Sequence, residues 1–456
     1  MADKKNPIGR EESQAVLEHI RSKKEEYLDI MKRLVAQPSI SARGEGVEEC
    51  AHLLVEIMED LGISARTLPT RGFPVVYGEV GSGDFTLLFY GHYDVQPPEP
   101  LEEWISPPFE PTERDGRLYG RGTGDNKGQL LCHLLAVHSY LQVRGDLPLK
   151  IKFILEGEEE SGSPHLAEFA SENQELLAAD LVYTSDGPLH ESGAPAIYYG
   201  VRGMLGLEMS LQTAAGDNHS GNKGGVIPNA AWELVKILSS MRDEQDRVRV
   251  KGFNDQVRPP TAKDQELIQN MDFEPEQIAR NFGVEKIDLD QEDFYRRLTL
   301  QPTMSINGLS SGYQGQGTKT IIPARASAKM DCRLVADQDP PEIFELLKQH
   351  IQGMHPGVEV TRQGYMYPSR TDPGLEVCER VLQAVQEATG EKPVALPATG
   401  GSLPDYVWTR ILKQPSIIVP YANADEDNHA PNENLSLDCF YQGLEITARV
   451  IYELSR

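Results

Sequence analysis

The sequence has few cysteines, no long apolar run and too few basic residues to balance its acidic ones. Its five cysteines, Cys50, Cys132, Cys332, Cys378 and Cys439, are odd in number and never form a Cys-x-x-Cys pair. This spacing argues against a disulfide framework and against a thiolate metal site. We therefore expect a reducing, cytoplasmic location.

Charge and hydrophobicity exclude several classes of partner. Residues 1–26 are dense in Lys, Glu and Arg and lack the apolar core of a signal peptide, and no stretch approaches the ~18 apolar residues of a membrane span. The chain has 44 Lys and Arg against 70 Asp and Glu, a formal net charge of −26. Such a charge repels nucleic-acid phosphates and anionic lipids, so we expect no nucleic-acid or membrane partner. Because the chain also lacks a signal-peptide core and a membrane span, we expect a soluble, unexported protein.

The length of 456 residues predicts two domains, because single hydrophobic cores stop growing below this size. Helical spacing of apolar residues predicts helices over 11–35, 47–61 and 129–142. Short apolar runs predict buried strands over 85–90, 151–155, 181–184 and 416–420. This alternation is typical of an α/β domain with a mostly parallel sheet flanked by helices.

The pattern changes after Gly200-Val201-Arg202-Gly203. Residues 205–211 and 319–335 alternate apolar and polar side chains, which favours half-exposed antiparallel strands. Helices are predicted over 228–241 and 341–351, a strand near 358–361, and loops with short helices over 243–297. We therefore predict an α+β domain, residues 204–371, inserted into a discontinuous outer domain of residues 1–203 and 372–456.

Candidate ligands follow the predicted strands of the outer domain. The first strand runs into Gly91-His92, and Asp94 is placed to orient the His92 imidazole. The glycine-rich turn 121–128 lacks the spacing of a phosphate-binding loop and has Asp125 at its centre, which favours a cation. Because ligands gather at the carboxyl ends of strands in open α/β sheets, these side chains mark a candidate active site.

Further acids and a histidine follow the other strands. One strand ends in three consecutive glutamates, Glu158 to Glu160, which would repel one another unless cations neutralise them. Asp186 and His429 follow two more strands. Each of these residues alone is more often a helix cap or a solvated side chain.

Together the candidate ligands indicate a paired metal site. Nitrogen and oxygen donors without sulfur suit Zn²⁺, Mn²⁺ or Co²⁺. If one carboxylate bridges, each of two metals receives one histidine, one further carboxylate, the bridge and a shared water. Spacing alone leaves open which of the three glutamates is a ligand.

The motifs Gly91-His92-Tyr93-Asp94-Val95, Gly124-Asp125-Asn126-Lys127-Gly128, Glu159-Glu160-Ser161-Gly162, Ser185-Asp186 and Asn428-His429 resemble those of a metallopeptidase family. That family comprises carnosinases, cytosolic nonspecific dipeptidases, aminoacylases and glutamate carboxypeptidases, and the carnosinase and cytosolic dipeptidase branch is the most similar. The resemblance implies that His92 and Asp186 bind one metal, that Glu160 and His429 bind the other, and that Asp125 bridges them. It also implies that Glu159 is the general base, that Asp94 steadies His92, and that the Asp125-Asn126 peptide bond is cis.

The resemblance also brings in residues of the inserted domain. His219 is expected to stabilise the oxyanion from the partner subunit of a homodimer formed through this lid domain. Arg333 is expected to hold the substrate carboxylate, with Thr320, Gly401 and Ser402 lining the same pocket. From the residues alone, Arg333 is equally well read as a solvated strand residue.

The function that follows is hydrolysis of dipeptides or short peptides with a free C-terminal carboxylate, using two metals, most simply zinc, and a bridging water activated by Glu159. One alternative is an amidohydrolase that deacylates N-acyl amino acids with the same machinery. A second is a binding protein that keeps the fold without catalysis, although the intact Glu159 argues against it.

Overall fold

The chain divides into two compact units. In the computed structural model, which describes residues 7–456, the first unit comprises Met1–Gly200, Thr371–Pro397 and Pro404–Arg456. The second comprises Val201–Arg370 and Ala398–Leu403. Residues 1–6, part of the charged N-terminal stretch and of the predicted outer domain, lie outside the described residues. Residues 398–403 are part of the second unit, whereas the sequence pattern assigned them to the outer domain.

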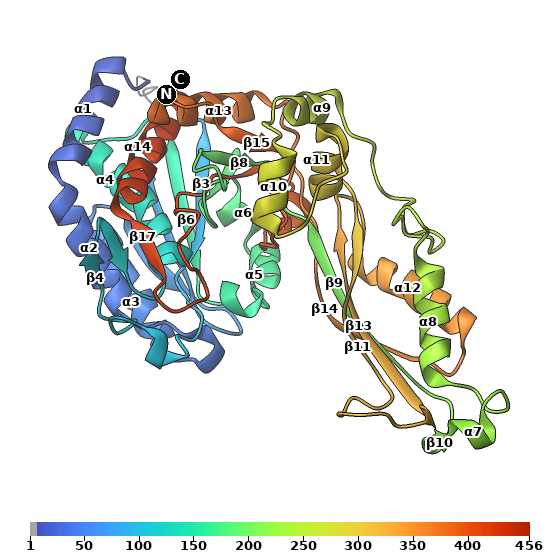
Figure 1. Cartoon of the computed structure of the whole chain (residues 1–456). Helices are drawn as coiled ribbons and strands as arrows, with labels where there is room; N and C mark the ends of the chain where they lie inside the picture. Colours follow the sequence, from blue (N-terminus) through green and yellow to red (C-terminus); the bar gives the residue numbers. More distant parts are fainter. Residues whose placement is uncertain (1–6) are drawn as a thin grey trace. The chain divides into compact units, whose positions relative to one another are not determined.

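An eight-stranded sheet forms the centre of the first unit, in the order β1-β2-β6-β3-β7-β16-β8-β15 (Figure 1). Its strands are β1 Ser64–Leu68, β2 Val75–Gly81, β3 Thr86–His92, β6 Lys150–Glu156, β7 Leu181–Thr184, β8 Ala196–Tyr198, β15 Val394–Leu396 and β16 Ser416–Ile418. The central strands β6, β3, β7 and β16 are parallel, as are β8 and β15. The pairs β1–β2, β2–β6 and β16–β8 are antiparallel. The predicted mostly parallel sheet is therefore confirmed.

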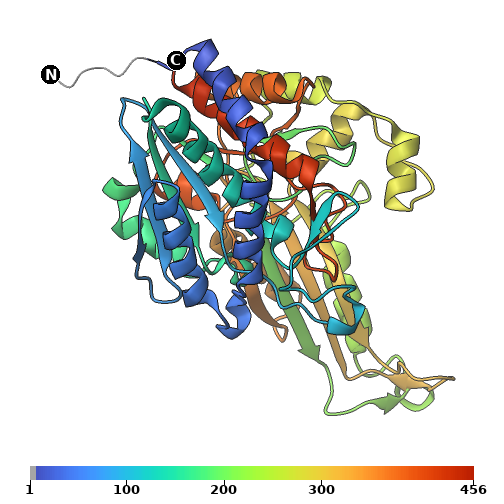
Figure 2. The same ribbon diagram turned by 90° about the vertical axis from the view of Figure 1, so that its left-hand side faces the viewer.

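Helices cover both faces of this sheet, because its strands alternate apolar side chains between the two sides. Leu88 and Tyr90 of β3 pack in the same cluster as α5 (Leu166–Glu172), while Phe89 stacks on His133 of α4 with ring centroids 4.4 Å apart. Figure 2 shows α1 to α3 in blue together with α14 in red on the α4 side. The remaining helices of the unit are α1 Arg10–Ser22, α2 Lys24–Ala36, α3 Val47–Asp60, α4 Gly128–Arg144, α6 Gln174–Leu177, α13 Glu376–Thr389 and α14 Leu437–Leu454.

The parallel strands bring chemically important positions to one edge of the sheet. His92 is the last residue of β3 and pairs with Glu156, the last residue of β6. Ser185 and Asp186 follow β7 directly. A small three-stranded sheet of β4 (Thr112–Arg114), β5 (Arg117–Tyr119) and β17 (Asn434–Ser436) brings the chain after His429 next to the chain before the glycine-rich turn.

One of the predicted helices is divided into two helices in the structure. The helix predicted over 11–35 is interrupted at Lys23, whose φ of −108° and ψ of 14° leave the helical region, so that α1 ends at Ser22 and α2 begins at Lys24. The segment has no Gly or Pro to signal this break. Within residues 7–456, no helix combines the length and the apolar character needed to cross a bilayer.

The second unit is built on a four-stranded antiparallel sheet in the order β11-β13-β9-β14. Its strands are β9 Gly203–Gln212, β11 Thr303–Ser311, β13 Arg325–Leu334 and β14 Glu359–Met366. A two-stranded ribbon of β10 (Asn218–His219) and β12 (Ile321–Ile322) lies apart from this sheet. The alternation over 205–211 did predict β9, but β11 was missed because most of its side chains are exposed and carry little apolar periodicity.

One face of the second sheet forms that unit's core. Alternate residues of β9 and β13, such as Leu207 and Met330, pack against Leu234 of α8 and Leu347 of α12. The helices of this unit are α7 Ser220–Lys223, α8 Ala230–Met241, α9 Ala262–Gln269, α10 Pro275–Phe282, α11 Gln291–Thr299 and α12 Pro340–Met354. The other face is left more exposed, as expected for an antiparallel sheet covered on one side.

Candidate active site

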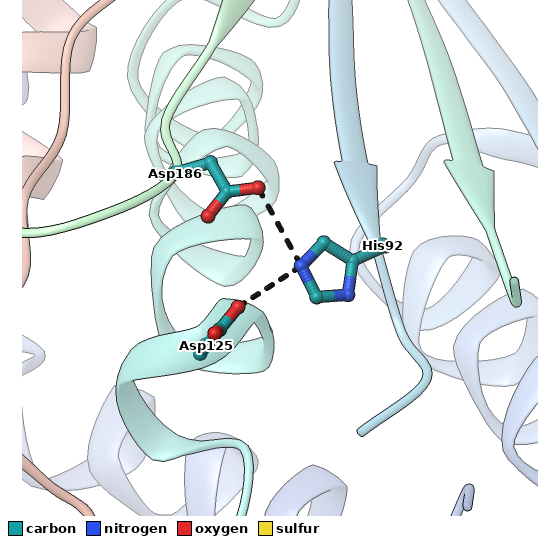
Figure 3. Close-up of side chains that lie close together, drawn as sticks. All are labelled: His92, Asp125 and Asp186. Carbon is teal, nitrogen blue, oxygen red and sulfur yellow. Dashed lines mark ion pairs between the residues drawn. The ribbon is translucent and has the colours of Figure 1, made fainter. Parts of the chain in front are cut away.

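Three predicted ligands meet at the end of β3. His92 Nε2 lies 3.1 Å from Asp125 Oδ1 and 3.5 Å from Asp186 Oδ2, and all three residues are buried (Figure 3). His92 ends β3, Asp186 follows β7, and Asp125 comes from the turn that precedes α4. One nitrogen and two carboxylate oxygens within 4.8 Å of one another can hold a metal ion.

A second group of ligands shares Asp125. His429 Nε2 lies 3.0 Å from Asp125 Oδ2 and 3.1 Å from Glu160 Oε2. Asp125 thus turns one carboxylate oxygen to His92 and the other to His429. This is the arrangement that a carboxylate bridging two metals requires. The Asp125-Asn126 peptide bond is cis, as the resemblance implied.

Asp94 holds both the histidine and the glutamate segment. Its Oδ1 and Oδ2 accept hydrogen bonds from the backbone N–H groups of Glu159 and Glu160, each at 3.1 Å. Its Oδ1 is also 3.5 Å from His92 Nδ1, whose closer contact is the Asp94 carbonyl oxygen at 3.1 Å. Removal of Asp94 would therefore disturb the histidine and the glutamates together.

The three glutamates point to different partners. The Glu158 carboxylate lies 2.8 Å from His165 Nδ1, away from the two ligand groups. Glu160 accepts a hydrogen bond from Gln96 Nε2 at 2.9 Å and faces His429. The Glu159 carboxylate has no hydrogen bond or ion pair within residues 7–456. Glu159 is the member of the run that is left available for chemistry.

Burial and like charge shape the electrostatics of the site. Burial raises the pKa of Glu159 well above its ordinary value, and the nearby acids Asp186, Asp125 and Glu160 add to this. Burial likewise raises the pKa values of Glu160 and Asp186. Although burial opposes it, the close imidazoles of His429 and His92 hold the pKa of Asp125 well below its ordinary value.

The donor atoms themselves support a bound cation. His92 Nε2 and Asp186 Oδ2 are buried, and neither has a hydrogen-bond partner among residues 7–456. A buried polar atom without a partner costs free energy, about 1–3 kcal/mol, unless something else satisfies it. Both atoms face the same ligand group, and a divalent cation would satisfy both. The residues present therefore fit a metal.

Buried polar residues that the sequence analysis did not single out fix the Asp125 turn. The Glu433 carboxylate accepts hydrogen bonds from the backbone N–H groups of Gly122, Gly124 and Asp125 at 2.9–3.0 Å, and from Arg121 Nη1 at 2.7 Å. Asn126 is the second such residue. Its Nδ2 donates to the Ser185 carbonyl oxygen at 2.5 Å, and its Oδ1 accepts weakly from His92 N. Glu433 and Asn126 thus connect the segments that carry four ligands.

His219 and Thr320 lie together in the second unit. His219 is the last residue of β10 and pairs with Ile321 of β12. Thr320 directly precedes β12, and its carbonyl oxygen accepts from Ser220 N at 3.1 Å. His219 is exposed, and its Nδ1 accepts a hydrogen bond from Gly221 N at 3.1 Å. Because Nδ1 is an acceptor, the neutral ring carries its proton on Nε2 and can donate from there.

Arg333 and Ser402 also lie together, but at the other end of β13. Arg333 Nη1 donates to Ser402 Oγ at 3.1 Å, and Gly401 is exposed in the same turn. Thr320 precedes β13, so the length of that strand separates it from Arg333 by about 25 Å. The expectation that Thr320 and Arg333 line one pocket is therefore not met within one chain, because the strand between them is extended.

Comparison with known proteins places this site among peptidases. The model of peptidase family M20/M25/M40 matches residues 88–453. Beta-Ala-His dipeptidase of Mus musculus is 30% identical over 408 residues, which cover 84% of this chain and 80% of the mouse protein. Cys-Gly metallodipeptidase of Schizosaccharomyces pombe is 27% identical over 471 residues, covering 96% of this chain and 97% of that protein.

Two solved structures are similar over nearly the whole chain. An M20 family metallo-carboxypeptidase from Sulfolobus solfataricus is 36% identical, with a TM-score of 0.84, and covers 94% of this chain and 99% of its own. Human carnosine dipeptidase 1 is 26% identical, with a TM-score of 0.76, and covers 99% of this chain and 100% of its own.

Proposed function

The chain belongs to peptidase family M20/M25/M40, as its motifs suggested, and from this we propose the details of its activity. It is a metal-dependent dipeptidase that hydrolyses dipeptides or short peptides with a free C-terminal carboxylate. The observation that carries this proposal is that two ligand groups share Asp125 beside the unpaired Glu159. The alternative of a non-catalytic binding protein is not retained, since the relatives are peptidases.

We propose that two divalent cations, most simply Zn²⁺, occupy the site. His92, Asp125 and Asp186 would hold one, and Asp125, Glu160 and His429 the other. When bound, the two ions would polarise the scissile carbonyl group and lower the pKa of a water molecule between them. The two histidines and the absence of sulfur donors also suit Mn²⁺ or Co²⁺.

Glu159 acts in this proposal as the general base and then as the acid. Its carboxylate takes a proton from the attacking water and passes it to the leaving amine. Burial favours the protonated form of Glu159, which suits a group that must hold the proton between these two steps. Asp94 keeps Glu159 in place through the hydrogen bond to its backbone N–H.

The inserted unit supplies groups that recognise substrate. We propose that the Nε2 proton of His219 is donated to the oxyanion, a role supported by the Gly221 hydrogen bond that makes Nδ1 the acceptor. Arg333, with Ser402 and Gly401 in the adjacent turn, binds the substrate carboxylate. Thr320 belongs with His219 rather than with Arg333, because Thr320 directly precedes Ile321, with which His219 pairs.

We propose that the protein is a homodimer formed through the second unit. Its edge strand β11 exposes Ile306 and Leu309, at 52% and 58% of their surface, and α8 exposes Trp232 at 64%. Exposed apolar residues on an edge strand favour pairing with another chain. In such a dimer, His219 and Thr320 serve the active site of the partner subunit.

A cytoplasmic location completes the proposal. All five cysteines are free, and four of them are buried, which suits a reducing compartment. The net charge of −26 argues against nucleic-acid and membrane partners.

The test is a screen of dipeptides and N-acyl amino acids with the metal-reconstituted protein, read as kcat/KM. We expect dipeptides with a free C-terminal carboxylate to be the better substrates and chelation to abolish their hydrolysis. Higher kcat/KM values for N-acyl amino acids would identify the protein as an amidohydrolase instead. Each metal, Zn²⁺, Mn²⁺ and Co²⁺, is added separately to the chelated protein to find which one restores activity.

A further inference from the structure

Arg202 is an arginine without an acidic partner. It precedes β9, and its backbone is fixed, because its N–H donates to the Thr399 carbonyl oxygen at 3.2 Å and its own carbonyl oxygen accepts from Ser402 Oγ at 3.2 Å. The side chain is partly buried, and its Nε is buried without a hydrogen-bond partner. No carboxylate within residues 7–456 forms an ion pair with it.

Other arginines of the same unit are paired. Arg370 binds the buried Asp264, and Arg258 binds Asp337 with two nitrogens. An unpaired guanidinium held partly away from water is costly, and arginine does not lose its proton to relieve this cost. The contrast indicates that an anion from outside the chain pairs with Arg202.

Arg333 is a basic neighbour of Arg202, and both guanidinium groups lie against the turn formed by Gly400 to Ser402. Arg333 Nη1 donates to Ser402 Oγ at 3.1 Å and lies 3.5 Å from the Gly400 carbonyl oxygen. A Cβ atom on Gly400 would lie 3.5 Å from Arg202 Nη2, so the same turn contacts both arginines. The second glycine of the turn, Gly401, faces open space.

The charges around the turn leave one positive charge to be balanced. Arg202 and Arg333 carry two, and Asp331, whose Oδ2 is 3.5 Å from Arg333 Nε, supplies one negative charge. Burial and the charge of Arg333 both lower the pKa of Arg202, which shows that the two arginines oppose each other. One carboxylate would neutralise the cluster.

We propose that Arg202 is a second specificity residue for the substrate's C-terminal carboxylate, which binds between Arg202 and Arg333 beside the Gly400–Ser402 turn. This inference rests on the proposed peptidase function and names the group that its substrates must carry. A single carboxylate suffices, so neutral C-terminal residues are accepted, and peptides whose C-terminus is amidated are rejected.

The first experiment compares Ala-Ala with its C-terminal amide in the wild type and in Arg202→Met. Loss of a charged hydrogen-bond partner is expected to lower kcat/KM for Ala-Ala about 10- to 100-fold. The kcat/KM for the amide is expected to stay unchanged, so that the preference for Ala-Ala over its amide is largely lost. Arg202→Lys should keep part of the preference, and Arg258→Met, which removes a paired surface arginine of the same unit, should keep all of it. A preference unchanged in both Arg202 variants would overturn the proposal.

A second experiment does not depend on catalysis. The melting temperature of the metal-free protein is measured with Ala-Ala and with its amide at tens of millimolar. We expect Ala-Ala to raise it in the wild type and in Arg258→Met, but not in Arg202→Met, and the amide to raise it in none of them. If no peptide is hydrolysed but this pattern holds, the proposed function fails and the carboxylate site stands. A rise by Ala-Ala that persists in Arg202→Met refutes the site.

Discussion

The two units present their functional side chains in opposite ways. In the first unit, residues from five separate segments converge on one point, which is buried around His92 and Asp186 and exposed at His429, with Asp125 shared by both ligand groups. In the second, His219 and Thr320 lie at one end of the long strand β13, while Arg333 and Ser402 lie at the other. One chain therefore brings both candidate ligand groups together but places the proposed substrate-recognition groups at opposite ends of a strand. In the first unit, and at the Arg202 and Arg333 end of the second, the proposed roles can be tested by removing one side chain, whereas the proposed role of His219 has to be tested by combining two chains.

The largest effect is expected in the first unit, from Glu159→Ala. Because Glu159 carries the proton in the proposed mechanism and is not one of the proposed ligands, the variant should keep both metals and lose kcat by about 10³-fold or more. Metal content is measured by elemental analysis and turnover with the best dipeptide of the screen. The matched control is Glu158→Ala, one residue away, whose carboxylate pairs with His165. Activity near that of the wild type in Glu159→Ala would rule out the proposed mechanism.

The second prediction tests whether His219 acts in the active site of the partner subunit, whereas Glu159 acts in the site of its own chain. His219→Ala and Glu159→Ala are each expected to be nearly inactive. In a dimer containing one of each, one site combines an intact Glu159 with the intact His219 of the other chain. Random reassociation should therefore restore about a quarter of the wild-type activity.

The control for this mixture is each variant taken alone through the same dissociation and reassociation. Absence of recovery in a mixture shown to contain the mixed dimer would mean that His219 serves its own chain. The comparison between the units would then have to be redrawn, with both ends of β13 acting within one chain.

A smaller effect is expected from the groups that hold the Asp125 turn. In Glu433→Gln, an amide replaces a carboxylate that accepts from Arg121 and from three backbone N–H groups. The amide nitrogen faces donors, so the turn loosens, and metal affinity should fall about 10- to 100-fold. Competition with a chelator of known affinity measures this. Asp425→Asn, on the same loop but exposed, should leave the affinity unchanged.

Much of the first unit could be predicted from local sequence, and the reason is geometric. Parallel strands end at one edge, so His92 and Asp186 were placed by the strands that precede them. Glu433 and Asn126 carried no such signal, because what they do depends on which backbone groups lie opposite them after folding. The break at Lys23 was missed for a related reason, since neither Gly nor Pro marks it.

The second unit was harder to predict because its roles came from resemblance alone. His219, Thr320 and Arg333 stand on exposed or half-exposed positions, where alternation of polar residues is expected without any function. Alternation correctly predicted the strand that carries Arg333, but not that Thr320 lies beyond its far end. A residue without a partner, such as Arg202, shows itself only when the surrounding structure is known.

The last prediction concerns stability rather than catalysis, and it depends on a buried acid whose surroundings differ between the units. In the second unit, the buried Asp264 is paired with Arg370, but in the first unit Glu156 has only the hydroxyl groups of Tyr90 and Ser163, at 2.5 and 2.9 Å. Burial raises the pKa of Glu156 to about 8. Between the ordinary pKa and this value, the folded protein keeps a proton that the unfolded chain has lost. Stability is therefore greatest at acidic pH and falls as the pH rises towards 8.

Glu156→Gln should remove this dependence, because the amide oxygen still accepts from Tyr90 and Ser163 while no charge can form. Relative to this variant, the metal-free wild type should lose about 4 kcal/mol of unfolding free energy between pH 5 and pH 8.5, since a change of one in pKa corresponds to about 1.4 kcal/mol. Urea unfolding of both proteins at the two pH values measures the difference. If the free energy of unfolding changed by the same amount with pH in both proteins, Glu156 would ionise freely in the folded protein. The first unit would then tolerate a buried charge without a basic partner, and the contrast with Asp264 would no longer separate the two units.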